Sequence, residues 1–191
     1  RAFTLQALGQ DSLAGAEFGR LATRLPDSWQ AQHGYGSWLL DHGRAAEAVP
    51  FLEKAAGDAP ERGELHRDLG FAYENVGNDV AAGVALSRAL QLGQESAELH
   101  LSLGLAALRR GSPQLAEKNW ERGLVLDPNH FRTLYNLGLL RLGQGRDGDA
   151  AELWRRAAAV DPRNPLIPFQ QARLALRDQI EAMVKRMKIQ E

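Results

Sequence analysis

Residues 97–130 read AELHLSLGLAALRRGSPQLAEKNWERGLVLDPNH, and residues 131–164 read FRTLYNLGLLRLGQGRDGDAAELWRRAAAVDPRN. In both stretches a glycine stands at the eighth position, a tryptophan at the twenty-fourth, and an Asp-Pro pair near the end. Shared residues at a fixed period indicate a repeat protein, in which each repeat is one small supersecondary unit. The two stretches therefore define a register of 34 positions against which the rest of the chain can be compared.

The register extends over most of the chain. Glycine occupies position 8, at Gly36, Gly70, Gly104 and Gly138, and position 15, at Gly9, Gly43, Gly77, Gly111 and Gly145. Alanine recurs at position 20, at Ala14, Ala48, Ala82, Ala116 and Ala150. A large apolar residue follows four residues later, at Phe18, Leu52, Leu86, Trp120 and Trp154. Proline closes most units, at Pro26, Pro60, Pro128 and Pro162, with Gln94 in the remaining place. Five columns in one register cannot arise by chance.

Each column has a structural meaning. Between the two glycine columns, apolar residues such as Leu99 and Leu103 recur at helical spacing. The glycine at position 15 is expected to end this helix in the left-handed conformation. Ser112 and Pro113 then have the sequence of an N-cap and a first helical residue. The proline column stops this second helix. The sequence therefore predicts a helix–turn–helix hairpin in every repeat.

The glycines at position 8 lie in the middle of the first helix, where each costs about 1 kcal/mol relative to alanine. A penalty that recurs in every repeat needs a recurring compensation. We expect close approach of the second helix, which presents the small alanine of position 20 to the glycine. The large residue of position 24 is then expected to wedge between neighbouring hairpins.

The chain resembles the tetratricopeptide repeat (TPR) family, whose 34-residue period and Leu-Gly, Ala-x-x-x-Phe and Pro marks it shares. The Leu-Gly mark stands at Leu69-Gly70, Leu103-Gly104 and Leu137-Gly138, with Tyr35-Gly36 as a variant. The resemblance implies an all-α fold, a right-handed α-solenoid of hairpins. Full repeats are predicted at 29–62, 63–96, 97–130 and 131–164, after a partial repeat at 1–28. The tyrosine that is typical of the family is not present in every repeat. The fourth full repeat, for example, has Arg141 at this position.

Residues 165–191 are predicted to form a long C-terminal helix, the first half of which caps the last repeat. Its second half outruns a repeat helix and is basic, with Lys185, Arg186 and Lys188. An apolar stripe with spacings of three and four residues follows the helix, at Phe169, Ala172, Leu176, Ile180, Met183 and Met187.

The composition excludes several classes of protein. None of the 191 residues is a cysteine, which excludes disulfides, thiolate nucleophiles and cysteine-based metal sites. No apolar run approaches the ~20 residues of a membrane helix. A formal net charge of −1 argues against a general nucleic-acid binder. We therefore expect no membrane insertion and no nucleic-acid partner, and the compartment stays open.

Motifs that could carry catalysis are weak. Gly143-Gln-Gly-Arg-Asp-Gly148 matches the dinucleotide pattern GxGxxG, but it follows a predicted helix instead of a strand. His66 and His100 occupy equivalent repeat positions, yet no third ligand has a spacing suited to zinc. No serine stands in a GxSxG elbow. We predict a protein that is not an enzyme, with no catalytic residue, cofactor or metal.

Function is expected on the surface. In TPR proteins, positions 2, 5, 9 and 12 of the first helix line a concave groove that binds peptides, and the resemblance implies the same here. This stripe is polar and acidic before residue 97, and apolar with an arginine rim over residues 97–176. We predict that it binds an apolar or amphipathic segment of a partner protein. The predicted groove residues are Arg67, Phe71, Leu101, Leu105, Leu108, Arg109, Arg132, Tyr135, Asn136, Leu139, Leu142 and Arg173.

Three alternatives stay open. The apolar groove could be filled internally, by the terminal helix or by a second copy of the chain. A homo-oligomer could form head to tail, because residues 1–96 have 8 basic and 13 acidic residues and residues 97–191 have 15 and 11. The terminal helix could also pair with a second copy as a short coiled coil. Finally, the incomplete first repeat suggests an accessory domain of a larger enzyme or of an envelope or secretion complex.

Overall fold

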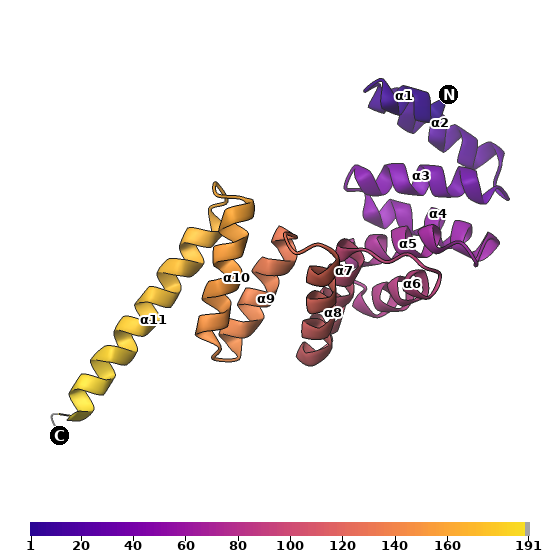
Figure 1. Ribbon diagram of the computed structural model, residues 1–191. Coiled ribbons are helices and arrows are strands. Elements are labelled where there is room, and N and C mark those ends of the chain that lie inside the picture. The colour runs from indigo at the N-terminus through magenta and orange to yellow at the C-terminus, as the bar shows by residue number, and fades with distance from the viewer. Residues whose placement is uncertain (190–191) are drawn as a thin grey trace. The chain divides into compact units, whose positions relative to one another are not determined.

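The computed structural model describes the backbone of residues 1–189, which forms eleven α-helices and no strand (Figure 1). The helices are α1 (Ala2–Ala7), α2 (Asp11–Arg24), α3 (Trp29–Asp41), α4 (Ala45–Asp58), α5 (Gly63–Asn75), α6 (Asp79–Gln91), α7 (Ala97–Arg109), α8 (Pro113–Leu126), α9 (Phe131–Gly143), α10 (Asp147–Val160) and α11 (Leu166–Ile189). The prediction of an all-α fold built from hairpins is confirmed.

The helices keep the sequence register residue for residue. The first helices of the four full repeats, α3, α5, α7 and α9, begin at residues 29, 63, 97 and 131. The second helices, α4, α6, α8 and α10, begin at residues 45, 79, 113 and 147. Each of these steps is one 34-residue period, so equivalent residues of different repeats occupy equivalent places on their helices.

The chain divides into two compact units, Arg1–Ala116 and Glu117–Glu191. In the first unit each helix packs against the next one, from α1 through α7. In the second unit α9 packs against α10, and α10 against α11. The boundary falls inside α8, in the middle of a repeat, where the sequence indicated no division.

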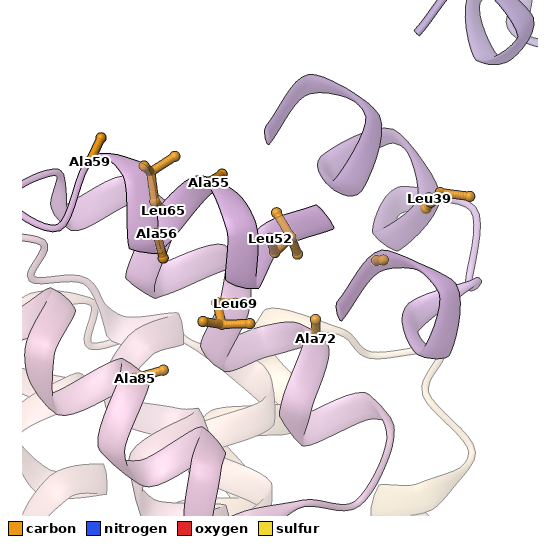
Figure 2. Packing of buried hydrophobic residues seen from close by; sticks show 10 residues of the cluster. Leu39, Leu52, Ala55, Ala56, Ala59, Leu65, Leu69, Ala72 and Ala85 are labelled. Atoms are coloured by element: carbon orange, nitrogen blue, oxygen red, sulfur yellow. The ribbon is translucent and has the colours of Figure 1, made fainter. Parts of the chain in front are cut away.

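One core cluster of the first unit consists of alanines and leucines, mainly from the facing sides of α3, α4 and α5, with Ala85 from α6 (Figure 2). Leu52 of α4 and Leu65 of α5 are completely buried in it. The alanines of position 20 are also completely buried, here Ala48 and Ala82. Small residues at these places let the helices pack closely, and burial of each leucine contributes about 1.5–3 kcal/mol.

The glycines at position 15 end the first helices as expected. Gly43 has φ of +71° and Gly77 has φ of +79°, the left-handed region that residues with a Cβ atom rarely adopt. After Gly43, the amide of Arg44 donates to the carbonyl oxygen of Leu39 at 2.9 Å, which satisfies a carbonyl at the helix end. The short turns between the helices of a hairpin depend on this conformation.

The glycines at position 8 face a different partner from the one expected. A Cβ atom on Gly70 would lie 2.6 Å from Cδ2 of Leu86, and one on Gly36 would lie 2.8 Å from Cδ2 of Leu52. These leucines occupy position 24, not the alanine position 20. The close approach is therefore real, and the glycine makes room chiefly for the large residue of its own hairpin, with the carbonyl oxygen of Ala48 also 3.4 Å from a Cβ atom on Gly36. Leu52 belongs to the same buried cluster as Leu65 and Leu69 of the next hairpin, which agrees with the expectation that position 24 packs between hairpins.

An ion-pair cluster links α8 to α9 within the second unit. Arg141 of α9 is buried and pairs with Glu117 and Glu121 of α8, with its Nη2 atom 2.6 Å from Oε1 of Glu121. Arg146, in the turn after α9, also reaches Glu117, at 3.5 Å. A charged side chain thus fills the place where the family has a tyrosine.

The C-terminal helix α11 packs through a different face from the predicted stripe. Ile167, Gln170 and Leu174 are buried, and Arg177 pairs with Asp147 of α10 at 3.1 Å. The described part of the stripe is exposed, with Phe169 and Met183 exposed by 65% and 60%. The predicted side chains Arg186, Met187 and Lys188 lie outside the described ones. The helix therefore caps α10 and leaves its apolar stripe uncovered.

Candidate protein-interaction surface

The predicted stripe forms a cavity in the first unit. It has a volume of about 490 Å³ and lies diagonally across the first helices of three repeats, from the end of α3 over the middle of α5 to the start of α7. Its lining residues are Ser37, Leu40, Asp41, Arg67, Asp68, Phe71, Ser96 and Glu98. Two predicted residues, Arg67 and Phe71, are thus brought together with residues of both neighbouring repeats.

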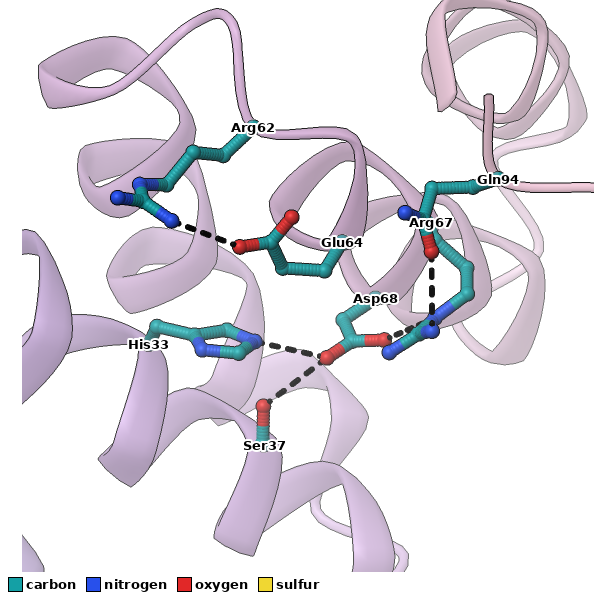
Figure 3. A network of polar contacts seen from close by, with 7 residues as sticks. All are labelled: His33, Ser37, Arg62, Glu64, Arg67, Asp68 and Gln94. Atoms are coloured by element: carbon teal, nitrogen blue, oxygen red, sulfur yellow. Dashed lines mark hydrogen bonds and ion pairs between the residues drawn. The ribbon is translucent and has the colours of Figure 1, made fainter. Parts of the chain in front are cut away.

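A polar network forms the central wall of this cavity (Figure 3). Asp68 of α5 accepts hydrogen bonds from His33 Nε2 at 2.8 Å and from Ser37 Oγ at 3.2 Å, both on α3. Arg67 Nε donates to the other carboxylate oxygen of Asp68 at 2.8 Å. Arg67 Nη1 also reaches Gln94 Oε1 at 3.4 Å. The network therefore ties two repeats together and fixes the Arg67 side chain.

The charge of Asp68 is maintained by these contacts. Burial raises the pKa of the Asp68 carboxyl, but the hydrogen bonds from His33 and Arg67 outweigh it and hold the pKa below its ordinary value. Asp68 is therefore a carboxylate at neutral pH. Because it already has three donors, its role is structural.

The leucines of α7 are less accessible than predicted. Leu101 is completely buried, so the prediction that it is an exposed anchor is wrong. Leu105 is half-buried and Leu108 is 38% exposed. Arg109 pairs with Asp79 of α6 at 3.0 Å. An apolar partner could reach Leu105 and Leu108 in this structure, but it could not reach Leu101.

In the second unit, the predicted residues of α9 are partly engaged with their neighbours. Tyr135 stacks on Phe131, with ring centroids 6.3 Å apart, and its hydroxyl accepts a hydrogen bond from Gln170 of α11 at 3.0 Å. Asn136 Nδ2 donates to the carbonyl oxygen of Arg132 at 2.7 Å, while the Arg132 side chain is exposed. Tyr135 therefore positions α11 as well as lining the surface.

A second cavity of about 400 Å³ lies between the end of α9 and α11. Its lining residues are Leu139, Leu142, Gly143, Gly145, Arg173 and Arg177. Leu142 is buried, which corrects its prediction as an exposed anchor, while Leu139 is half-buried and Arg173 is exposed. Gly143 and Gly145 belong to the GxGxxG stretch, which forms the turn between two helices.

Sequence reasoning missed several residues of these cavities. Asp41, Asp68 and Ser96 line the first cavity, and Arg177 lines the second. Asp41 and Asp68 each follow a stripe residue directly in sequence, at Leu40 and Arg67. Their position next to a stripe residue could have indicated them, because a groove that crosses a helix is also lined by the side chains that flank the stripe.

The described residues give no sign of a metal site or a membrane span. His66 Nε2 donates to the carbonyl oxygen of Pro60 at 2.9 Å, and His100 Nε2 donates to Glu95 Oε1 at 3.1 Å. Among the side chains that the structure describes, no three His, Cys, Asp or Glu residues are placed to hold a metal ion. Within the described residues, no helix combines the length and apolar content needed to cross a bilayer.

Comparisons with known proteins agree with the repeat register. Two family models, both described as tetratricopeptide repeat, match the chain, one over residues 39–106 and one over residues 101–166. Together they extend without a gap from the first full repeat to the start of α11. No curated protein matches the chain.

Several solved structures have a similar fold. The crystal structure of MamA is 22% identical, with a TM-score of 0.75, and the match covers 85% of this chain and 95% of that one. YrrB, described as a TPR protein with an unusual peptide-binding site, is 22% identical with a TM-score of 0.75, over 90% and 88% of the two chains. A thermophilic TPR protein of Thermus thermophilus is 22% identical with a TM-score of 0.67, over 92% and 95%. Likenesses at this identity establish the fold alone.

Proposed function

The chain belongs to the tetratricopeptide repeat family, and from this premise we propose that it is a non-catalytic scaffold that binds a segment of a partner protein on the concave stripe of its first helices. The observation that supports this most is the cavity across α3, α5 and α7. It has the volume of a ligand site and combines apolar with polar lining residues, as specific recognition requires.

The apolar contacts of this site come from side chains that are partly accessible. Leu40 and Phe71 line the cavity and are half-buried. Leu105, at the same repeat position as Phe71, and Leu108 continue the stripe along α7. A partner segment that places apolar side chains on this stripe gains about 25 cal/mol for each Å² of apolar surface removed from water. Its affinity is reduced by the entropy lost on ordering the segment.

The test is a selection of random peptides displayed on phage against the folded chain, followed by affinity measurements on the enriched peptides. Leu105→Glu and Leu108→Glu place a charge on the stripe, so we expect at least tenfold weaker binding. Val84→Glu is the matched control, because Val84 is 67% exposed on the second helix α6 and lies outside the cavity. A selection that enriches no peptide contradicts the proposal, and so do affinities that both stripe variants leave unchanged.

A second candidate function is self-assembly through α11. The exposed residues Phe169, Leu176 and Met183 are spaced by seven, and Ile180 lies between the last two at heptad spacing. Exposed apolar residues at this spacing are typical of a coiled-coil seam, and they favour pairing of two copies of α11. Sedimentation velocity should then show a dimer that Leu176→Glu with Ile180→Glu converts to a monomer. A monomer in the unaltered chain rules this function out.

A further inference from the structure

A third cavity, of about 750 Å³, lies along the second helix α6 in the first unit. Its lining comes from seven residues of α6, three of α5 and Arg110, the residue after α7. It shares no residue with the cavity across α3, α5 and α7. Two arginines, Arg88 and Arg110, belong to the lining, and no carboxylate does. The sign of its charge is therefore positive.

The helix α6 presents small side chains to this cavity. Position 21 of the register is Gly83, and position 25 is Ser87. The other second helices have long charged side chains at position 25, namely Glu53, Glu121 and Arg155. The outer face of α6 is thus hollowed at a place where the equivalent helices are filled.

The next repeat shows which group fills the place next to Gly83. Position 21 of that repeat is Glu117, and position 14 of the following helix is Gln144. Gln144 Nε2 donates to Glu117 Oε2 at 3.1 Å, and Arg146 Nη1 lies 3.5 Å from the other carboxylate oxygen. Gly83 and Arg110 occupy the same two positions one repeat earlier. There the carboxylate is missing, although the residue that faces its place is a cation.

The Arg110 side chain lies against α6 without an anionic partner. Its Nη1 atom would be 3.5 Å from a Cβ atom on Gly83. It is exposed and makes no ion pair or side-chain hydrogen bond with the part of the chain that the structure describes. Asp79, one turn before Gly83 on α6, pairs with Arg109 instead, at 3.0 Å. The Arg110 guanidinium is thus available to a carboxylate from outside the chain.

Arg88 adds a second cation to the same cavity. Its Nη1 atom lies 3.5 Å from Oε1 of the neutral residue Gln91, which is the outer limit of a hydrogen bond. Two guanidinium groups in a hollow without a carboxylate attract anions. Arginine is also the residue best suited to a carboxylate, because its two parallel N–H groups match the two oxygens.

Apolar surface beside the arginines suits a protein segment better than a free anion. Val84 is 67% exposed and Tyr73 is half-buried, and both line the cavity. The volume is in the range of sites that enclose a ligand of several side chains. A small anion would leave the apolar part of the cavity in contact with water, whereas an acidic residue next to an apolar one covers both parts.

We infer that this cavity is a second docking site, which binds an acidic amphipathic segment of a partner protein. An Asp or Glu side chain of the segment pairs with Arg110, in the place that Glu117 fills in the next repeat, and an apolar side chain packs on Val84. The inference goes beyond the proposed function, because this site lies along a second helix and not on the concave stripe. The charges on the page select the occupant.

The experiment is a phage selection of random peptides on the full chain, with counter-selection on the variant Gly83→Glu. This variant restores at position 21 the carboxylate that the next repeat has, and a Cβ atom there makes only an ordinary contact with Arg110. Peptides that bind the unaltered chain and not the variant should carry Asp or Glu beside an apolar residue. A synthetic copy should bind at least tenfold more tightly than the same peptide with Asn or Gln, and added salt should reduce this difference.

Further variants locate the effect at Arg110. Arg110→Gln should weaken the acidic peptide at least tenfold, and it tests the inference even if Gly83→Glu fails to fold. Gly83→Ala is the matched control for the counter-selection, because it adds the Cβ atom without the charge and should leave the affinity within about threefold. Arg24→Gln is the control for charge, because it removes an exposed arginine at the end of α2, outside the cavity.

The outcomes separate this inference from the proposed function. Finding no peptide that Gly83→Glu loses overturns the inference, and so do lost peptides without an acidic residue or with affinities that Arg110→Gln leaves unchanged. Peptides weakened by Leu105→Glu alone then still support the proposed function. Acidic peptides lost on Gly83→Glu, with none that the stripe variants weaken, support the inference and contradict the proposed function.

A second copy of the chain is the remaining occupant that the experiment identifies. Sedimentation velocity would then show self-association that Gly83→Glu and Arg110→Gln each abolish. Acidic residues of another copy would be the ligand in that case, which overturns the assignment to a partner protein. A chain that stays monomeric and binds the acidic peptide supports the assignment.

Discussion

The indole ring of Trp154 lies against the backbone of Gly138, in the space that a side chain at position 138 would need. A Cβ atom on Gly138 would be 2.8 Å from Cδ1 of Trp154, closer than Cβ atoms approach other atoms in proteins. The indole Nε1 atom donates to the carbonyl oxygen of Tyr135 at 3.2 Å, and Trp154 is completely buried. A glycine in the middle of α9 and a tryptophan in α10 therefore depend on each other.

Gly138→Ala is expected to destabilise the protein, although alanine is the better helix former. The gain in helix propensity is about 1 kcal/mol, but the Cβ atom must displace a ring that is packed on all sides. Overpacking of this kind costs typically 1–3 kcal/mol, so the net effect should be a loss of up to about 2 kcal/mol. Urea unfolding followed by tryptophan fluorescence measures it.

Gly148→Ala is the matched control for this change. Gly148 lies in α10, and a Cβ atom there would meet nothing within 4 Å. The substitution should leave stability unchanged or raise it by up to about 1 kcal/mol. Equal effects at positions 138 and 148 would contradict the role given to Trp154.

Arg141→Met should destabilise the contact between α8 and α9. Methionine keeps the apolar stem but leaves Glu117 and Glu121 without their shared cation. Breaking a buried ion pair costs about 3–5 kcal/mol, and because Glu121 is exposed we expect about 2 kcal/mol here. Arg155→Met removes the exposed pair with Glu152 on α10 and should cost less than about 0.5 kcal/mol. Thermal unfolding of both variants measures these losses of stability. An equal loss of stability in Arg141→Met and Arg155→Met would argue against a structural role of Arg141.

Asp68 should make stability depend on acid pH. Its pKa is lower in the folded chain than its ordinary value, so its contribution is fully present above about pH 4. It is lost as the pH falls through the folded pKa. Asp68→Asn should cost about 1–3 kcal/mol at neutral pH, and the difference from the unaltered chain should shrink below about pH 4. Asp41→Asn, which removes an exposed carboxylate of the neighbouring helix, should leave the stability at neutral pH nearly unchanged in urea unfolding.

Tyr73 should ionise at unusually high pH. Burial and a hydrogen bond that its hydroxyl donates to Glu53 raise the pKa of Tyr73 to about 12. Because the folded pKa is raised, the stabilisation is fully present below about pH 10 and is lost as the pH rises towards 12. Ultraviolet titration of phenolate formation should show one late component that Tyr73→Phe removes. Glu53→Gln should move this component to lower pH, and an unchanged titration in that variant would exclude the assigned cause.

The helical register could be predicted from sequence because the residues that set it act through the backbone. A glycine such as Gly43 ends a helix by its own φ, and Pro113 starts one without help from distant parts of the chain. The close approach at position 8 could also be predicted, since a penalty in the middle of a helix needs a compensation. The identity of the partner could not, because Ala48 and Leu52 lie one turn apart on the same helix face.

The site was harder to predict because it depends on contacts between repeats. His33 and Asp68 are 35 residues apart, so their hydrogen bond joins different positions of neighbouring repeats. The 34-residue period gives no information on that offset. Likewise, Leu101 and Leu105 lie on one stripe of α7, but the first is buried and the second half-buried. The spacing of the stripe shows which face of the helix a residue lies on. It does not show which residues of other helices cover that face at each position.

The constant spacing of the first helices, with no insertion between residues 29 and 164, has a consequence for how such a protein can change. Removing or duplicating any window of 34 residues would leave every remaining helix in the same register as before. The array could thus be lengthened or shortened by whole modules without redesign of its joints. Insertion or deletion of a single residue within a helix of one repeat would shift the residues after it in that helix out of register with the equivalent residues of the other repeats.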